Sequence, residues 1–324
     1  MEDPILLAVP NVSEGRDRQA LAQIASAFAD SAPASGTAAV RLLDVHSDAD
    51  HHRSVFTIAG APRALGDALL RGARATVESV DVVSRADAAR EERGQHPHVG
   101  SVDVVPIVYV READRGAACA LALLVADRIG QELDVPVFLY GELTGETDGE
   151  ARTRAQLRRG GVSGLARRLA AAGGGEPQAA ADPGEGPLTP DFGPHELHAR
   201  AGATLVCARA PLVAFNLQLA DPATLVTARE VAALVREGGP MGLPGVRAIG
   251  VMLGGARAQV SMNVERPLQV PLAEVLGAVS RLAPVHSAEL VGLAPAAAMA
   301  GFPADVPMPG FDPQRHVIEN ALGC

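Results

Sequence analysis

Five of the nine histidines of this chain gather in two short segments, and imidazole is the side chain best suited to move a proton near neutral pH. The first segment, LDVHSDADHHRS, contains His46, His51 and His52, and the second, GQHPHVGSVDV, contains His96 and His98. We predict that both segments are turns beside strands, where a rigid sheet can aim a side chain into a cleft. The pattern indicates acid–base chemistry, with solvated loop histidines as the alternative.

Carboxylates stand among the first group of histidines, so a metal site is a second possibility. Asp44, Asp48 and Asp50 lie in this segment, and mixed His and Asp sets bind zinc or iron. However, neither His-His nor His-Pro-His has the helical i, i+4 spacing that makes HExxH specific for zinc. We therefore expect a site without metal and keep a His-rich metal-dependent hydrolase as the weaker hypothesis.

The basic residues exclude several classes of enzyme. All 28 basic side chains are arginines, and the chain has no lysine. Schiff-base chemistry, pyridoxal phosphate attachment and the P-loop lysine are therefore excluded. The net charge of −10, the absence of tryptophan and an aromatic content of 3 % argue against a nucleic-acid partner. An anionic small molecule would need a local cluster of arginines.

The cysteines and the apolar runs indicate the compartment. Cys119, Cys207 and Cys324 are isolated from one another, which suits a reducing environment. The longest strongly apolar run, Ala117–Ala126, is about half the length of a bilayer span. The N-terminal Met-Glu-Asp-Pro lacks the basic flank of a signal peptide. We expect a cytoplasmic protein with no membrane partner.

The apolar residues alternate between strand and helix periodicity along the chain. We predict strands at 5–10, 40–45, 54–59, 102–110, 136–143, 204–218, 248–253, 258–263 and 288–293. We predict helices at 16–30, 62–80, 111–133, 223–237 and 272–282. Strands outnumber the crossovers of a strict β-α-β repeat, which favours an α+β fold.

A Gly/Pro-rich segment, residues 173–190, interrupts this pattern and is predicted to be a loop. The order strand, helix, hairpin, helix, strand follows in the second half and is close to that of ferredoxin-like folds. We place the boundary between two subdomains at residue 210, so that the N-terminal subdomain covers 1–210. The C-terminal subdomain and its tail cover 211–324.

Two turns contain further candidate residues. The segment Asn11–Gly15 follows the first predicted strand and precedes a helix. Ser13 or Asn11 could cap this helix, or the amides of the turn could bind an anion. The second turn, Asp191–Thr204, follows the Gly/Pro-rich loop. Its Arg200 could hold a carboxylate or could simply be solvent-exposed.

Six blocks of this sequence resemble the formiminotransferase family, that is, glutamate formimidoyltransferase. They are VPNVSEG at 9–15, LLDV with HRSVFT at 42–57, HPHVGSVDVVP at 96–106, VPVFLYGE at 135–142, DFGP with GAT at 191–204, and AFN at 214–216. The blocks occur in the family's order, and the resemblance extends from residue 9 to about residue 293.

The resemblance implies both a fold and an activity. The fold would be α+β, with two ferredoxin-like subdomains whose sheets face each other and enclose a folate tunnel, in a homodimer. The activity would be transfer of a formimidoyl group from N-formimidoyl-L-glutamate to N5 of tetrahydrofolate, which gives 5-formimidoyltetrahydrofolate and L-glutamate. Tetrahydrofolate would be the acceptor substrate, in one-carbon metabolism and histidine degradation, and no metal would be needed.

The resemblance also implies roles for individual residues. His96 stands at the position of the family's catalytic histidine and would be the general base that takes a proton from N5. Arg53 would bind a substrate carboxylate. Residues that bind substrate or support the site would be Asn11, Glu14, His46, His52, Arg53 and Asn216. The folate-binding segment would consist of Gly193, Pro194, His195, Glu196, Leu197, His198, Ala199, Arg200, Ala201 and Gly202.

The chain departs from the family pattern close to the expected base. Gln95 and His98 stand where the family usually has glutamate and arginine, and His46 and His52 stand where it has aspartate and asparagine. Ala201 replaces a tryptophan. These departures leave two alternatives, a diverged paralogue that uses another one-carbon donor such as N-formylglutamate, and a non-catalytic folate-binding protein.

Overall fold

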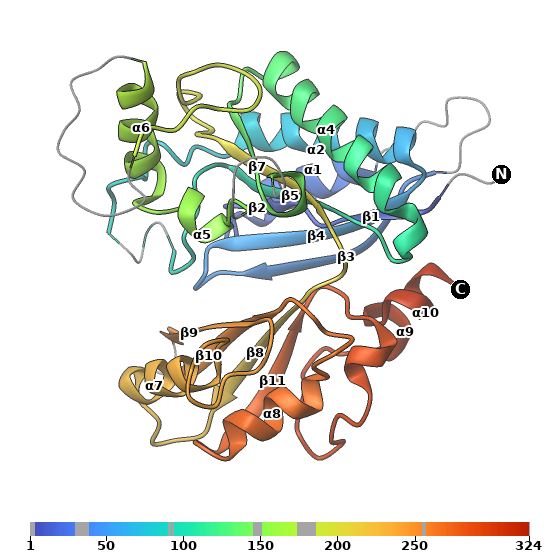
Figure 1. The fold of residues 1–324 in the computed structure, drawn as a ribbon, viewed down its shortest axis with the longest axis vertical. Helices are drawn as coiled ribbons and strands as arrows, with labels where there is room; N and C mark the ends of the chain where they lie inside the picture. The colour runs from blue at the N-terminus through green and yellow to red at the C-terminus, as the bar shows by residue number, and fades with distance from the viewer. Residues whose placement is uncertain are drawn as a thin grey trace. The chain divides into compact units, whose positions relative to one another are not determined.

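A computed structural model describes residues 4–29, 39–89, 92, 94–144, 151–173, 186–254 and 257–323. The chain divides into two compact units, Met1–Ala210 and Pro211–Cys324 (Figure 1). Each unit combines helices with one β-sheet, so the fold is α+β, as the periodicity predicts. No helix within the described ranges is both long and apolar enough to cross a bilayer.

The first unit is built on a seven-stranded sheet. Its strands are β1 (Leu6–Ala8), β2 (Asn11–Val12), β3 (Arg41–Asp48), β4 (Arg53–Gly60), β5 (Val102–Val108), β6 (Val137–Leu139) and β7 (Thr204–Arg209). β1 and β2 both lie between β4 and β5, and Pro10, which has no N–H to donate, separates them. β3 pairs with the other side of β4, while β7 and β6 continue the sheet beyond β5 in parallel.

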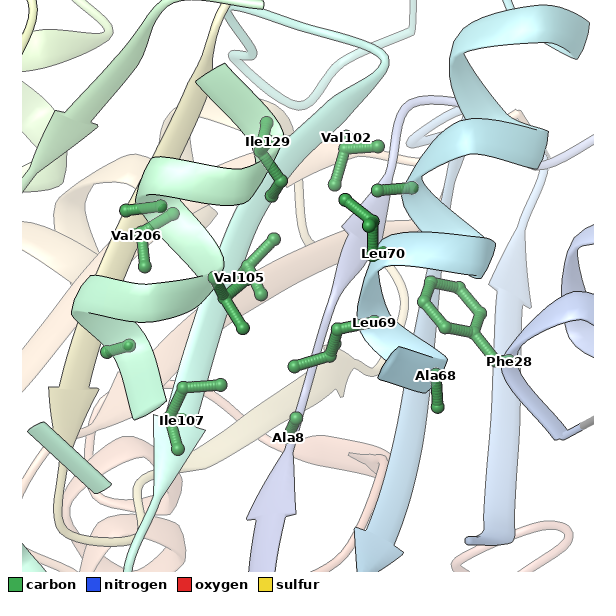
Figure 2. Packing of buried hydrophobic residues seen from close by; sticks show 14 of the residues in the cluster. Ala8, Phe28, Ala68, Leu69, Leu70, Val102, Val105, Ile107, Ile129 and Val206 are labelled. Atoms are coloured by element: carbon green, nitrogen blue, oxygen red, sulfur yellow. The ribbon is translucent and has the colours of Figure 1, made fainter. Parts of the chain in front are cut away.

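Three long helices cover one face of this sheet (Figure 1). They are α1 (Arg18–Ala29), α2 (Pro62–Ser79) and α4 (Arg115–Glu132), and a 3₁₀ turn, η1 (Glu112–Asp114), precedes α4. Figure 2 shows Leu69 of α2 and Ile129 of α4 on the side of the sheet where Val105 and Ile107 of β5 point. All four side chains are at most 1 % exposed, so the main core of the unit lies between the sheet and these helices.

A second apolar cluster of the unit involves two shorter helices, α5 (Arg154–Leu157) and α6 (Gly161–Ala172). Leu157, Leu165 and Leu169 from these helices are buried in one cluster with Val104 and Leu205 of the sheet. A 3₁₀ turn, η2 (Gly141–Thr144), follows β6. The two helices therefore pack on a part of the sheet that is distinct from the main core.

The second unit consists of β8 (Val213–Leu219), α7 (Leu225–Val235), β9 (Val246–Met252), β10 (Ala258–Val264), α8 (Leu272–Ser280) and β11 (Val285–Val291). Its antiparallel sheet has the order β11-β8-β10-β9. The chain ends with η3 (Ala296–Met299), α9 (Pro313–His316) and α10 (Ile318–Leu322). Phe215, Leu217 and Val260 are fully buried in the core of this unit.

Both units contain the same connectivity. In the second, the order is strand, helix, strand, strand, helix, strand, and the strands lie in the order fourth, first, third, second. In the first, β1 with β2, then α1, β3, β4, α2 and β5 follow the same course, and these strands lie in the same spatial order. β6 and β7 with α4, α5 and α6 are additions to that plan in the first unit.

Most predicted elements are present, with several differences. The predicted strand 136–143 ends at Leu139, and the predicted strand 204–218 is two strands, β7 and β8, because Pro211 lies between them. α5 and α6 were not predicted. Residues 174–185 of the Gly/Pro-rich loop, Asp30, Gly255 and Cys324 lie outside the described residues.

Gly72 of α2 supports a prediction about packing. A Cβ atom at residue 72 would overlap the fully buried ring of Phe28. We expect Gly72→Ala to lower the free energy of unfolding by about 1–3 kcal/mol, because a crowded core must shift to accept the methyl group. Urea unfolding measures this change. In Gly116→Ala, at the start of α4, the new methyl meets nothing within 4 Å, so this control should be at least as stable as the wild type. Equal loss in both variants would contradict the packing argument.

Candidate active site

One face of β4 carries apolar core residues and the opposite face carries candidate site residues. Phe56 and Ile58 belong to the main core beneath the helices. Because successive side chains of a strand point to opposite faces, Arg53, Val55 and Thr57 lie on the other face. The Oγ1 atom of Thr57 is buried there without a hydrogen-bond partner. This second face of the sheet is therefore the polar one near β4.

Strand register brings two more candidates to this polar face. Asn11 of β2 and His46 of β3 are the residues opposite Val55 on its two neighbouring strands. Residues directly opposite each other share a face of the sheet, so both lie on the same face as Arg53. The prediction that His46 lies in a turn was wrong, because β3 continues to Asp48 and includes it. Asn11 is buried, and its Nδ2 donates to the carbonyl oxygen of Val9 at 2.8 Å.

His96 and Arg53 are in contact although they are 43 residues apart. Nη1 of Arg53 donates a hydrogen bond to Nε2 of His96. A guanidinium nitrogen cannot accept, so Nε2 carries the lone pair of the ring and the proton of the neutral ring is on Nδ1. Burial, and next the charge of Arg53, hold the pKa of His96 well below its ordinary 6.5. His96 is therefore an unprotonated imidazole near neutral pH.

Three arginines supply the positive charge around His96. Burial, and next the charge of Arg158, lower the pKa of Arg53 to about 9, so Arg53 is still charged at neutral pH. Nη2 of Arg158 forms an ion pair with Asp103, and these side chains are only 9 % and 1 % exposed. Arg154 also lowers the pKa of both Arg53 and His96. A buried cluster with this much positive charge suits a carboxylate ligand.

The turn before α1 is held by Glu14. Its Oε1 accepts the backbone N–H groups of Gly15, Arg16 and Asp17 at 3.0, 2.8 and 3.0 Å. The prediction that Ser13 or Asn11 caps α1 was wrong. Oγ of Ser13 donates to the carbonyl oxygen of Gly100 at 2.7 Å, and Asp17 accepts the backbone N–H groups of the first turn of the helix.

His52 connects this turn to a further arginine. Its Nδ1 lies 3.3 Å from Oε1 of Glu14, and its Nε2 accepts a hydrogen bond from Nη1 of Arg85. Burial lowers the pKa of His52 to about 4, although the charge of Glu14 acts in the opposite direction. The backbone N–H of Gly15 also donates to Nδ1 at 3.1 Å, so the ring of His52 lies between the turn before α1 and Arg85.

Comparison with known proteins identifies the family. The family model described as "Formiminotransferase domain, N-terminal subdomain" matches residues 5–209. The chain is also 32 % identical over 325 residues to a glutamate formimidoyltransferase of Streptococcus pyogenes, which covers 98 % of each protein. The chain belongs to the formiminotransferase family.

Two other relatives show the extent of the similarity. A glutamate formimidoyltransferase of Thermoplasma acidophilum is 30 % identical over 300 residues, which is 90 % of this chain and 88 % of that protein. A formimidoyltransferase-cyclodeaminase of Gallus gallus is 32 % identical over 302 residues, which is 90 % of this chain and 50 % of that protein. The formiminotransferase similarity thus extends over both units.

The segment Gly193–Gly202 is a turn closed by its own hydrogen bonds. The backbone N–H groups of His198 and Gly202 each donate to the other residue's carbonyl oxygen at 3.0 Å. Nδ1 of His198 accepts the backbone N–H groups of Arg200 and Ala201 at 3.2 and 2.9 Å. The carbonyl oxygen of Ala201 accepts from the N–H of Ser101 at 2.8 Å, which joins the turn to the chain that follows His96.

The side chains of two other predicted residues have acidic partners. Nε of Arg200 is 3.5 Å from a carboxylate oxygen of Asp81, and about half of the Arg200 side chain is exposed. Asn216 lies in the second unit, where its Nδ2 donates to Oε2 of Glu289 at 2.8 Å. Within the part of the chain that the structure describes, no three His, Cys, Asp or Glu side chains are grouped so that they could hold a metal ion.

Sequence reasoning missed four charged residues of the site, namely Arg85, Asp103, Arg154 and Arg158. Asp103 had a signal, since it is a charged residue in an otherwise β-branched run. α5 also had one, because Thr153 and Gln156 form a capping box at its start. The arginines themselves had no signal, because nothing distinguishes them locally from the other arginines of the chain.

The buried neutral His52 predicts a dependence of stability on pH. The pKa of about 4 in the folded state lies below the 6.5 of the unfolded state, so unfolded chains take up the proton first as the pH falls. The stabilisation from His52 is complete above pH 6.5 and is lost towards about pH 4, a change of about 3 kcal/mol.

Substitution of His52 tests this prediction by urea unfolding at about pH 7.5 and about pH 4.5. We expect the loss of unfolding free energy between these conditions to be smaller in His52→Asn than in the wild type. The exposed His286 provides a matched control, and His286→Asn should keep the wild-type loss. An undiminished loss in His52→Asn would show that His52 is not the group that titrates.

Proposed function

We propose that this chain transfers a formimidoyl group from N-formimidoyl-L-glutamate to N5 of tetrahydrofolate. The observation that supports this most is the unprotonated imidazole of His96 among three arginines. The reaction needs a base that accepts a proton, and the donor substrate needs cations for its carboxylates. Two relatives that match most of the chain are named glutamate formimidoyltransferase.

In the proposed reaction, N5 of tetrahydrofolate attacks the formimidoyl carbon and forms a tetrahedral intermediate. The proton of N5 passes to Nε2 of His96. The bond between this carbon and the glutamate nitrogen then breaks, and the leaving nitrogen takes the proton back from His96. The products are 5-formimidoyltetrahydrofolate and L-glutamate, and His96 returns to its neutral form. Alignment of the two substrates supplies further acceleration.

Arg53 has two roles in this proposal. In the free protein it occupies the lone pair of Nε2 on His96. A substrate carboxylate is a stronger acceptor for a guanidinium than a neutral imidazole is, so binding would draw Arg53 away and free Nε2. The carboxylate would also offset the positive charge that lowers the pKa of His96. Donor binding would thus make the base both accessible and stronger.

The other sites follow the family expectation. We assign tetrahydrofolate binding to the turn 193–202. The carbonyl oxygen of Ala201 in this turn accepts a hydrogen bond from the N–H of Ser101, five residues after His96. Asn11 and His46 share the sheet face of Arg53 and would contact substrate there. Glu14 and His52 would support the turn before α1, and Asn216 remains a predicted site residue. We also propose a cytoplasmic homodimer that acts in histidine degradation.

A formyl donor is the second candidate, and the charge of the site favours it. A formimidoyl group is an amidine that can carry positive charge, which the arginines around His96 would repel. N-formylglutamate has a neutral amide in the same place and keeps both carboxylates.

A direct assay distinguishes these functions. The purified protein is mixed with tetrahydrofolate and either N-formimidoyl- or N-formyl-L-glutamate, and the folate product is identified by mass spectrometry. We expect 5-formimidoyltetrahydrofolate from the first donor. A product from the formyl donor alone would favour the second candidate. Tetrahydrofolate binding without transfer from either donor would identify a non-catalytic folate-binding protein.

Substitution of His96 tests the role of the base. We expect His96→Gln to lower kcat by about 10²–10⁴-fold, because proton transfer in the transition state is lost. The dissociation constant for tetrahydrofolate, measured by calorimetry, should stay within about twofold of the wild type, because the substitution leaves the turn 193–202 unchanged. His286→Gln removes an exposed imidazole and should leave kcat unchanged. Full activity of His96→Gln would rule out His96 as the base.

A further inference from the structure

We propose that Arg154 binds a carboxylate of the glutamyl donor and thereby determines which donors the protein accepts. This inference rests on the proposed function, because it takes N-formimidoyl-L-glutamate as the donor. Arg154 stands outside the motif blocks and was not among the predicted site residues. Three observations support the assignment: its position on α5, its lack of a partner among the described residues, and the unpaired donors at Arg158 and His96.

α5 is fixed at both ends beside the site. At its start, Thr153 and Gln156 form a capping box, and Arg152 pairs with Asp191 at 2.6 Å. At its end, Arg158 pairs with the buried Asp103. Residues four apart on a helical turn project to the same side, so Arg154 lies on the side of α5 that carries Arg158. The helix therefore holds Arg154 towards the surroundings of His96, whose pKa its charge lowers.

Arg154 differs from its neighbours because it lacks a counterion. Arg152 and Arg158 each form an ion pair with an aspartate. The side chain of Arg154 is half-buried, yet within the described residues it makes no hydrogen bond or ion pair. A partly desolvated cation is unfavourable unless an anion approaches it. We therefore expect an anionic ligand to pair with Arg154.

Two neighbouring groups also lack an acceptor. Nε of Arg158 and Nδ1 of His96 are buried without a hydrogen-bond partner, and the side chain of Arg158 is nine-tenths buried. Nε always carries a hydrogen, and Nδ1 carries one while Nε2 accepts from Arg53. Together with Arg154, these groups present donors without acceptors around His96. A carboxylate, which has several acceptor positions, matches such a set.

The chemistry of the two substrates indicates which carboxylate this is. In N-formimidoylglutamate, only the amide-like nitrogen and the α-carbon separate the transferred carbon from the α-carboxylate. The carboxylates of tetrahydrofolate lie beyond its p-aminobenzoyl group, far from N5. A cation close to the base that acts at N5 can therefore reach the carboxylate of the donor more readily than that of folate. A position of Arg154 near His96 thus favours a carboxylate of the donor over one of folate as its ligand.

Calorimetry with the intact chain tests this inference without requiring turnover. N-formimidoyl-L-glutamate and tetrahydrofolate are each titrated into the wild type, Arg154→Gln, Arg154→Lys and the control Arg167→Gln. Arg167 is an exposed arginine of α6, so its variant loses the same charge away from the site. Circular dichroism verifies that each variant is folded.

We expect Arg154→Gln to bind the donor about 10–100-fold more weakly, as for the loss of a charge-assisted hydrogen bond, with tetrahydrofolate binding unchanged. Arg154→Lys should restore part of the affinity, because it keeps the charge but not the fork of donors. Arg167→Gln should bind both ligands as the wild type does. In turnover, the donor KM should rise in Arg154→Gln more than kcat falls.

Two results would overturn the inference. Donor binding by Arg154→Gln that equals the wild type would show that Arg154 has no ligand carboxylate. Weaker binding of tetrahydrofolate alone would assign the carboxylate to folate instead. Failure of the proposed function is a separate result, in which the wild type binds both ligands but transfers nothing. Weaker donor binding by Arg154→Gln would still support the role of Arg154 in that case.

Discussion

Burial of positive charge beside one neutral imidazole is the interaction on which the site depends. Arg53, Arg154 and Arg158 act on His96, and the buried Asp103 pairs with only one of them. Charge that is removed from water must be compensated by hydrogen bonds or by a ligand. Burial and these cations together keep His96 unprotonated, and the cations favour an anionic ligand. In the proposed function, the state of the base and the affinity for substrate are therefore coupled through one set of charges.

The sheet of the first unit makes this arrangement possible because it separates two environments. Three helices bury one face in an apolar core, so the opposite side chains of β4 are available for polar contacts. Close backbone contacts also join the segment after His96 to the turn 193–202. A Cβ at Gly100 would overlap the carbonyl oxygen of Ala203, so glycine is required where the chain after His96 meets the turn 193–202.

The departures from the family pattern are accommodated by neighbouring charges. His52, where the family usually has asparagine, is neutral and fits between Glu14 and Arg85. His98 stands where the family usually has arginine, yet Arg154 and Arg158 still act as cations on His96. The site therefore stays positively charged with histidines at these positions.

The sequence by itself determined the α+β alternation and the family, and it indicated His96 and Arg53 as candidate site residues, because periodicity and ordered motifs are local properties of the chain. Only the tertiary structure decided which charges surround His96. Arg53 and its partner His96 are 43 residues apart in the sequence. Arg158 and Asp103 are 55 residues apart, and Arg85 and His52 are 33 residues apart. Such contacts depend on strand register and on where α5 packs, and neither is encoded in the spacing of residues along one segment.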